Sequence, residues 1–202
     1  MSASRRLAAA ALAAILVAGV APIAGAQDGT AKPVTVKTVD DAMPAGAAPG
    51  LDASFYYFDF KTMDTMASYV ARAKASKRVA LPQLAASDDT GEIFAAGAKS
   101  MYGFRAVGWL RFPAAGDWKL VANSNDGIRI KLADQFALED PLPHPDRLTP
   151  ASEVKLPAAG FVPIEVLWYQ RRGSATIELL WVPPGKTEPE LVPPEAYWHK
   201  KP

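Results

Sequence analysis

Residues 107–132 read VGWLRFPAAGDWKLVANSNDGIRIKL, and this stretch decides the fold class of the chain. Two turn signals, at 113–117 and 124–127, separate three short runs of β-forming residues: Val107–Phe112, Trp118–Ala122 and Ile128–Leu132. Asp-Gly pairs favour tight turns because both positions tolerate positive φ. The second turn also carries the polar side chains of Asn123, Ser124, Asn125 and Asp126. A polar loop between rigid strands is a usual place for a binding site in a β-protein.

More short strands are predicted on both sides of this stretch. Aromatic or alternating runs occur at 54–60, 101–106, 153–156, 162–169 and 175–182. Strands at regular short spacing, joined by Gly/Pro turns, indicate a β-sandwich or a barrel. The segments 79–97 and 134–150 are rich in turn residues and are predicted to be mostly loop.

One helix is expected, over roughly Met63–Lys74. Apolar residues recur there at helical spacing, and Thr62 can cap the start. We interpret Met63 and Met66 as core-filling side chains.

The N-terminal residues of the chain predict an exported protein. Residues 1–26 combine Arg5 and Arg6, an apolar run and a small-residue cleavage motif, as in a secretory signal peptide. The apolar run is short for a membrane span, so we expect no span after cleavage. Residues 27–49 have little hydrophobic periodicity and are predicted to be a flexible tether. The alternating segment 34–39 leaves a strand open as an alternative.

Composition excludes several classes of function. Cleavage after residue 26 leaves 176 residues, one ordinary domain, with 20 basic against 21 acidic residues. This near-neutral balance argues against a nucleic-acid partner, which requires a basic surface. The chain has no Cys, so disulfides, thiolate metal sites and a Cys nucleophile are excluded.

Four motifs in order resemble those of one known family. They lie at Gly50–Tyr56 (GLDASFY), Val107–Leu120, Ser124–Ile130 (SNDGIRI) and Leu156–Trp181. The chain resembles the PA fourteen domain, named after a fragment of the anthrax protective antigen, over about residues 50–198. The resemblance implies an all-β, antiparallel β-sandwich with one short helical insertion. It also implies an extracellular module of a kind that often binds carbohydrate.

The resemblance also points to a calcium question. In the adhesin branch of the family, two adjacent Asp residues joined by a cis peptide hold a calcium ion. The matching positions here are Asn125 and Asp126, so one negative charge is missing. The matching second loop, 170–173, brings Arg171 and Arg172 and no carboxylate. We therefore expect no cofactor, with calcium at Asn125 and Asp126 as the alternative. In the other interpretation of Asp126, its carboxylate holds its own turn and Gly127 supplies a positive φ.

The candidate ligand-binding residues lie in two loops and on the strand that leads into the second loop. They are Asn123, Asn125, Asp126, Trp168, Tyr169, Gln170, Arg171 and Arg172. Arg forks recognise carboxylates and sulfates, although a solvated turn at 170–173 is an equally simple interpretation. Trp109, Trp118, Trp168 and Trp181 could stack on a sugar ring, but Trp118 and Trp181 are expected to be packed. Since Trp168 and Tyr169 point to opposite faces of their strand, one of the two is expected to be exposed. Trp198 is the other exposed candidate.

No catalytic arrangement is evident. His144 and His199 stand in Pro-rich loops without ligand spacing, and nucleophile-elbow, zinc-protease and phosphate-loop motifs are absent. The leading hypothesis is therefore an exported, non-catalytic module, periplasmic or extracellular, that binds a glycan or polysaccharide through loops at one end of the sandwich. The alternative is a structural or assembly subunit of a bacterial envelope complex with a protein partner.

Overall fold

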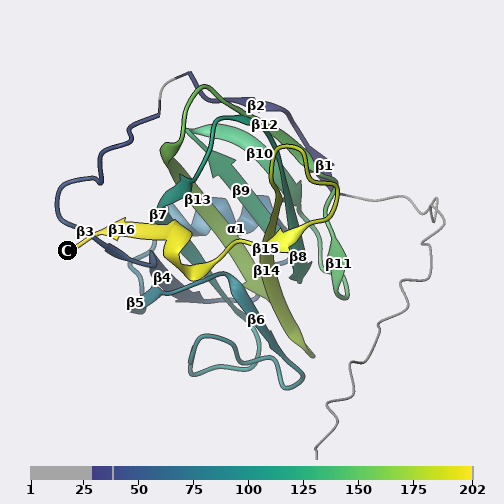
Figure 1. Ribbon diagram of the computed structural model, residues 1–202. Coiled ribbons are helices and arrows are strands. Elements are labelled where there is room, and N and C mark those ends of the chain that lie inside the picture. Colours follow the sequence, from purple (N-terminus) through teal and green to yellow (C-terminus); the bar gives the residue numbers. More distant parts are fainter. Residues whose placement is uncertain (1–28, 38, 202) are drawn as a thin grey trace, which may run out of the picture.

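The computed structural model describes residues 29–37 and 39–201, and its strands form two facing sheets (Figure 1). Within the described residues, sheet A has nine strands. In spatial order these are β1 (Thr30–Ala31), β10 (Gln135–Asp140), β9 (Ile128–Leu132), β13 (Gly160–Gln170), β7 (Tyr102–Phe112), β16 (Tyr197–Lys200) and β3 (Ala47–Pro49), with β4 (Leu51–Tyr57) beside β7 and β5 (Lys77–Leu81) beside β4.

Sheet B has seven strands in the same described part of the chain. They are β15 (Glu190–Leu191), β14 (Ala175–Val182), β8 (Gly116–Asn125), β12 (Ser152–Leu156) and β2 (Val34–Thr35), with β11 (Arg147–Leu148) beside β8 and β6 (Ala85–Asp88) beside β14. The β12–β2 pair is parallel and the other strand pairs are antiparallel. The predicted fold class, an antiparallel β-sandwich with one short helix, is confirmed.

The core lies between the sheets and follows from alternation along the strands. Inward residues of β13 and β14, such as Val166, Trp168 and Leu179, are fully buried. Aromatic rings fill the centre: the ring centroids of Phe104 and Trp168 lie 5.3 Å apart, in a stacked arrangement. Trp118 and Trp181 are packed, as predicted.

The two turns of the opening stretch connect different sheets. β7 belongs to sheet A, β8 to sheet B and β9 to sheet A again, so each turn is a corner of the sandwich. Gly127 does not adopt the predicted positive φ. It is needed for another reason: a Cβ at this position would lie 2.4 Å from Cε1 of Tyr169.

The helix α1 (Met63–Val70) covers part of the outer face of sheet A. Thr62 caps it as predicted, since its Oγ1 accepts a hydrogen bond from Thr65 N at 3.1 Å. Met63 and Met66 are fully buried and form a second small core with outward residues of the sheet: Tyr56, Leu167 and Tyr169. The helix ends earlier than predicted because the chain turns back after Ala73 to enter β5.

Several segments predicted to be loop are strands. β5 and β6 lie within or beside the segment 79–97, and β10 and β11 within 134–150. A short 3₁₀-helix, η1 (Pro194–Ala196), precedes β16. β6 and β11 pair with strands distant in sequence, so their own turn-rich composition does not determine their conformation. β10 instead forms a hairpin with the preceding strand β9, through a turn at Ala133 and Asp134 in which both residues have positive φ.

The predicted tether is packed against the sandwich where the structure describes it. β1 pairs with β10, β2 with β12 and β3 with β16, and Val34 and Val36 are buried. The alternative strand at 34–39 is thus found in part, at Val34–Thr35. The predicted signal peptide, residues 1–26, lies outside the described residues.

Candidate functional site

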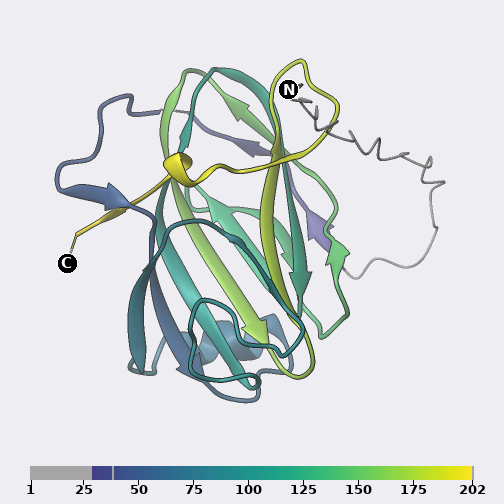
Figure 2. The same cartoon turned by 60° about the horizontal axis from the view of Figure 1, so that its bottom comes forward.

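Five connecting segments gather at one end of the sandwich, which we call the loop end. They are residues 58–62, 91–101, 126–127, 141–146 and 171–174. Backbone hydrogen bonds link them, from Phe58 N to Met101 O at 2.8 Å and from Met101 N to Arg171 O at 3.1 Å. Figure 2 shows α1 and the loop between β6 and β7 together at the lower end of the strands.

Asp126 stands at the centre of the loop end and ties two of its loops together. Oδ2 accepts a hydrogen bond from the backbone N–H of Arg171 at 2.6 Å, and Oδ1 accepts one from that of His144 at 3.2 Å. Asp126 is buried, with 5% of its surface exposed. The carboxylate therefore fixes the loops that follow β13 and β10, whereas the sequence interpretation had it holding its own turn.

Burial shifts the protonation equilibrium of the Asp126 carboxyl group. Desolvation raises the pKa of Asp126, and the N–H groups of Arg171 and His144 lower it in part. Its free-acid form is thus favoured more strongly in the folded protein than in the unfolded chain. A carboxyl group so enclosed is suited to hold backbone and poorly placed to contact a ligand directly.

Asn125 and Asp126 are joined by a cis peptide bond, and hydrogen bonds within the chain already engage both side chains. Calcium takes about six to eight oxygen ligands, several of them carboxylates. Both oxygens of Asp126 already accept N–H groups, and Asn125 Nδ2 donates to Ser174 Oγ at 3.1 Å. Among the described residues, no cluster of three or more His, Cys, Asp or Glu side chains could hold a metal ion.

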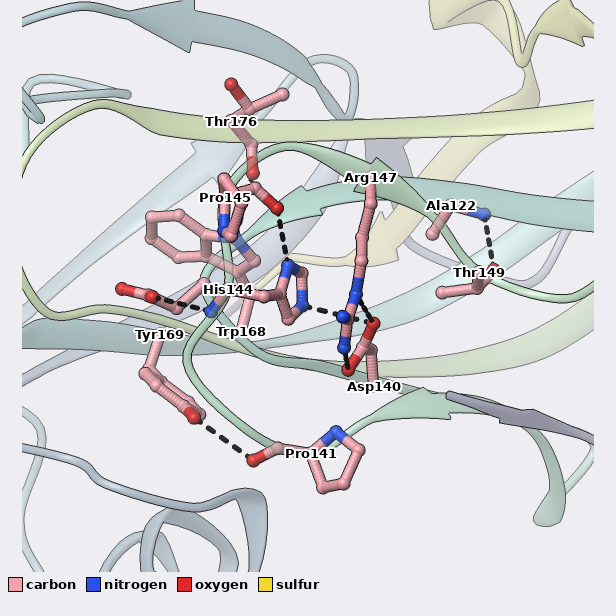
Figure 3. A network of polar contacts seen from close by, with 11 residues as sticks. Ala122, Asp140, Pro141, His144, Pro145, Arg147, Thr149, Trp168, Tyr169 and Thr176 are labelled. Atoms are coloured by element: carbon pink, nitrogen blue, oxygen red, sulfur yellow. Dashed lines mark hydrogen bonds and ion pairs between the residues drawn. The ribbon is translucent and has the colours of Figure 1, made fainter. Parts of the chain in front are cut away.

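A buried polar network holds the loop between β10 and β11 in place (Figure 3). Arg147 donates two hydrogen bonds of 2.7 Å to the buried carboxylate of Asp140. His144 Nε2 lies 3.2 Å from Asp140 Oδ2, and Nδ1 lies 2.7 Å from the carbonyl oxygen of Pro145. Tyr169 closes the other side of the loop, since its hydroxyl donates to Pro141 O at 3.0 Å. The network presents the backbone N–H of His144 to Asp126.

The accessible part of the loop end combines an aromatic ring with a charged pair. Phe58 is 45% exposed, and its ring stacks on Tyr69 of α1 with centroids 4.9 Å apart. Beside it, Arg171 Nε donates to Asp59 Oδ1 at 2.8 Å. That hydrogen bond lowers the pKa of the Asp59 carboxyl group. Arg172 is exposed next to the pair.

Three predicted ligand residues are fully buried. The Trp168 ring lies in the core and its Nε1 donates to Thr176 O at 3.1 Å, while Tyr169 lies under α1. The expectation that one of these two rings is exposed is wrong, because sheet B covers one face of β13 and α1 covers the other. Gln170 turns inward, and its Nε2 donates to Gly173 O and Ser174 O.

Asn123 is not at the loop end. Alternation along β8 places Asn123 on the outer face of sheet B, where its Nδ2 donates to Glu178 Oε2 at 3.0 Å. The structure thus brings together Asn125, Asp126, Arg171 and Arg172 from the predicted set. Trp198, the other predicted exposed ring, is half-buried against Phe161.

Sequence reasoning missed Phe58 and Asp59, and it considered His144 only as a metal ligand or a catalytic residue. The first two were included in an aromatic run predicted as one strand to Phe60, but β4 ends at Tyr57. The alternation of Asp59, Phe60 and Lys61 is itself compatible with a strand, so no local sign in the sequence marks the end of β4 at Tyr57. None of the helices in the described residues is long and apolar enough to cross a membrane.

Comparisons with known proteins agree with this geometry. The family model described as the PA14 domain matches residues 47–194. The PA14 domain of the antifreeze protein MpAFP superimposes with a TM-score of 0.65 at 13% identity, covering 80% of this chain and 96% of that one. The PA14 sugar-binding domain from an RTX adhesin gives a TM-score of 0.62 at 17% identity, covering 75% and 99%.

A third solved structure is the epithelial adhesin 9 A domain of Candida glabrata in complex with Galb1-4GlcNAc. It gives a TM-score of 0.59 at 13% identity and covers 85% of this chain and 96% of that one. No curated protein matches the sequence. Since the family model spans well over half of the chain and the fold agrees with it, this protein belongs to the PA14 domain family.

Proposed function

We propose that this protein is an exported, non-catalytic carbohydrate-binding domain that recognises glycans at the loop end. Family membership supports the class of ligand, because similar PA14 domains are a sugar-binding adhesin domain and an adhesin domain solved with a disaccharide. The observation that carries the proposal is the exposed Phe58 ring beside the Arg171–Asp59 pair.

The chemistry of these groups suits a sugar. An apolar aromatic face packs against the C–H face of a pyranose ring, and Arg and carboxylate groups offer fixed donors and acceptors for its hydroxyls. The side chains of Asp59 and Arg171 are each about one-third exposed, at 33% and 27%, so both remain reachable. Arg172 adds a further exposed cation that favours an acidic or sulfated sugar.

Binding at this site does not require calcium in our proposal. The carboxylate that would hold the ion is engaged by two backbone N–H groups, and the positive charge of Arg171 acts on it as well. Asp126 then acts indirectly, by fixing the backbone of Arg171.

Export rests on the predicted signal peptide, and mass spectrometry of the native protein should find a chain beginning at residue 27.

A glycan array with and without EGTA tests the proposal. We expect wild type to bind a subset of glycans equally in both conditions, and Phe58→Ala and Arg171→Ala to lose that binding. Leu191→Ala is the matched control, since Leu191 is 42% exposed but lies on β15, away from the loop end.

Absence of any bound glycan on a folded sample would refute the proposal. Binding that disappears with EGTA would refute its calcium-free form. If native protein that binds no glycan purifies with a stoichiometric envelope protein, the assembly role replaces the glycan-binding role.

A further inference from the structure

We propose that a second saccharide site lies in a groove across the outer face of sheet A, and that it takes a neutral oligosaccharide chain. We call it the outer-face groove. It is lined by residues of β4, β7, β9, β13 and β16, among them Asp52, Arg105, Trp109, Lys131, Pro163 and Glu165. The site is separate from the loop end and does not depend on it.

The groove exists because α1 covers only part of the outer face. The helix packs over Tyr56, Leu167 and Tyr169, and the outward positions further along β7 and β13 have no helix above them. The open part is a hollow of about 400 Å³ with Val107, Gly108 and Pro163 among its lining residues. That volume is within the range of about 300–1,000 Å³ typical of small-molecule sites.

The hollow continues in two directions. A second hollow of about 420 Å³, beside α1, shares Arg105, Lys131 and Glu165 with the first. A third, of about 460 Å³, lies beside β5 and shares Asp52 and His199. From β5 to β9 the path crosses four strand spacings, roughly 19 Å at ~4.8 Å each. An open path of this length suits a chain of several sugar units better than a single terminal sugar.

Trp109 provides the aromatic surface in this groove. The other four tryptophans each donate their indole N–H to an oxygen and pack against another ring. Across the described ranges 29–37 and 39–201, Trp109 has neither an acceptor for its Nε1–H nor a ring partner, and it is half-buried in the groove wall. Because this N–H is not enclosed, the indole presents both an apolar surface and an accessible donor to a ligand in the groove.

The charged groups of the groove indicate that the ligand is neutral. Arg105 Nε donates to Glu165 Oε2 at 2.9 Å, and Lys131 Nζ lies 3.6 Å from Glu165 Oε1. Asp52 pairs with Arg78 at the β5 side. The first hollow is lined by three basic side chains, Arg105, Lys131 and Lys200, and by three acidic ones, Asp52, Asp134 and Glu165, so it has no strong single-sign field to attract a polyanion. Arg105 and Lys131 retain N–H donors that can donate to the hydroxyl oxygens of a sugar. The paired carboxylates can in turn accept hydrogen bonds from sugar hydroxyls.

Affinity electrophoresis in gels that contain soluble neutral polysaccharides tests the inference. The probes are hydroxyethyl cellulose, xyloglucan, galactomannan and dextran, with polygalacturonate as the anionic comparison. We expect wild type to be retarded by at least one neutral polymer and not by polygalacturonate. Trp109→Ala should weaken that affinity about tenfold or more, and Trp109→Phe and Glu165→Gln by less. Leu191→Ala should be retarded like wild type, because Leu191 lies on β15 of sheet B, away from both the groove and the loop end.

A measurement on the wild-type protein avoids any folding defect of the variants. Oxidation by N-bromosuccinimide, mapped by mass spectrometry, should modify the half-buried Trp109 and Trp198 ahead of the three buried tryptophans, and only Trp109 lies in the groove. The retarding polymer should protect it. The inference is overturned if no neutral polymer retards the protein, if Trp109→Ala is retarded like wild type, or if the polymer does not protect Trp109. Loss of retardation in Phe58→Ala would assign the polymer to the loop end instead.

Discussion

Replacing Asp126 by Ala is expected to lower the free energy of unfolding by about 2–4 kcal/mol. The substitution leaves the backbone N–H groups of Arg171 and His144 without their acceptor in a buried place. Each unsatisfied buried group costs about 1–3 kcal/mol. The substitution also removes a charge that is costly to bury, as the raised pKa of Asp126 indicates. This offsets part of the cost of the two unsatisfied N–H groups, so the expected loss is in the lower part of their summed cost of about 2–6 kcal/mol.

Urea unfolding at pH 7, followed by tryptophan fluorescence, measures the effect. With a slope of about 2 kcal/mol per molar urea, the midpoint should fall by roughly 1–2 M. Asp126→Asn keeps one acceptor oxygen and should lose about half as much. Asp89→Ala is the matched control, because Asp89 is exposed, and it should stay within about 0.5 kcal/mol of wild type. If Asp126→Ala were as stable as the control, the carboxylate would not be what holds the two loops.

Three further predictions concern the same turn. Gly127→Ala should destabilise by about 1–3 kcal/mol in the same assay, because its Cβ would overlap the Tyr169 ring, and a wild-type midpoint would show that the ring can move aside. Millimolar calcium should leave the melting temperature equal to that in EGTA. A fitting site at 100 times its Kd would add about 2.7 kcal/mol, so a clear upward shift would contradict our assignment. The raised pKa of Asp126 means that the unfolded chain loses this proton first as the pH rises above 3.8. Wild type should therefore lose stability relative to Asp126→Asn from that pH up to the folded-state pKa. If wild type instead gained stability relative to Asp126→Asn as the pH rose, the pKa of Asp126 would be lowered by folding and not raised.

The strands of the sandwich were largely predictable because both sheets bury one face of long alternating runs. β14 and β9 have the predicted bounds, 175–182 and 128–132. β10 was missed because its hairpin turn with β9 uses Ala133 and Asp134, both at positive φ, without the Gly that usually signals such a turn. β6 was not predictable because its partner β14 lies far along the chain. Local composition cannot report a partner that lies many residues away.

The candidate site was predictable only in part, for a related reason. The motif around Asn125 and Asp126 correctly marks the centre of the loop end, but the sequence does not show that neighbouring loops occupy the carboxylate. The expectation that either Trp168 or Tyr169 is exposed is wrong, because a helix from elsewhere in the chain covers the second face of β13. Trp109 could not be singled out among five tryptophans, since its lack of partners is a property of the packed structure.

The first strands of the described chain have a practical consequence for preparing the domain. Thr30–Ala31 covers the edge of sheet A at β10, and Val34–Thr35, three residues later, covers the edge of sheet B at β12. The family match begins at residue 47 and ends at 194. A fragment cut to those limits would therefore lack the two edge strands β1 and β2, and β16 as well. Uncovered strand edges pair readily with other chains. Such a fragment is therefore expected to self-associate, and the smallest well-behaved unit should extend from about residue 29 to the end of β16.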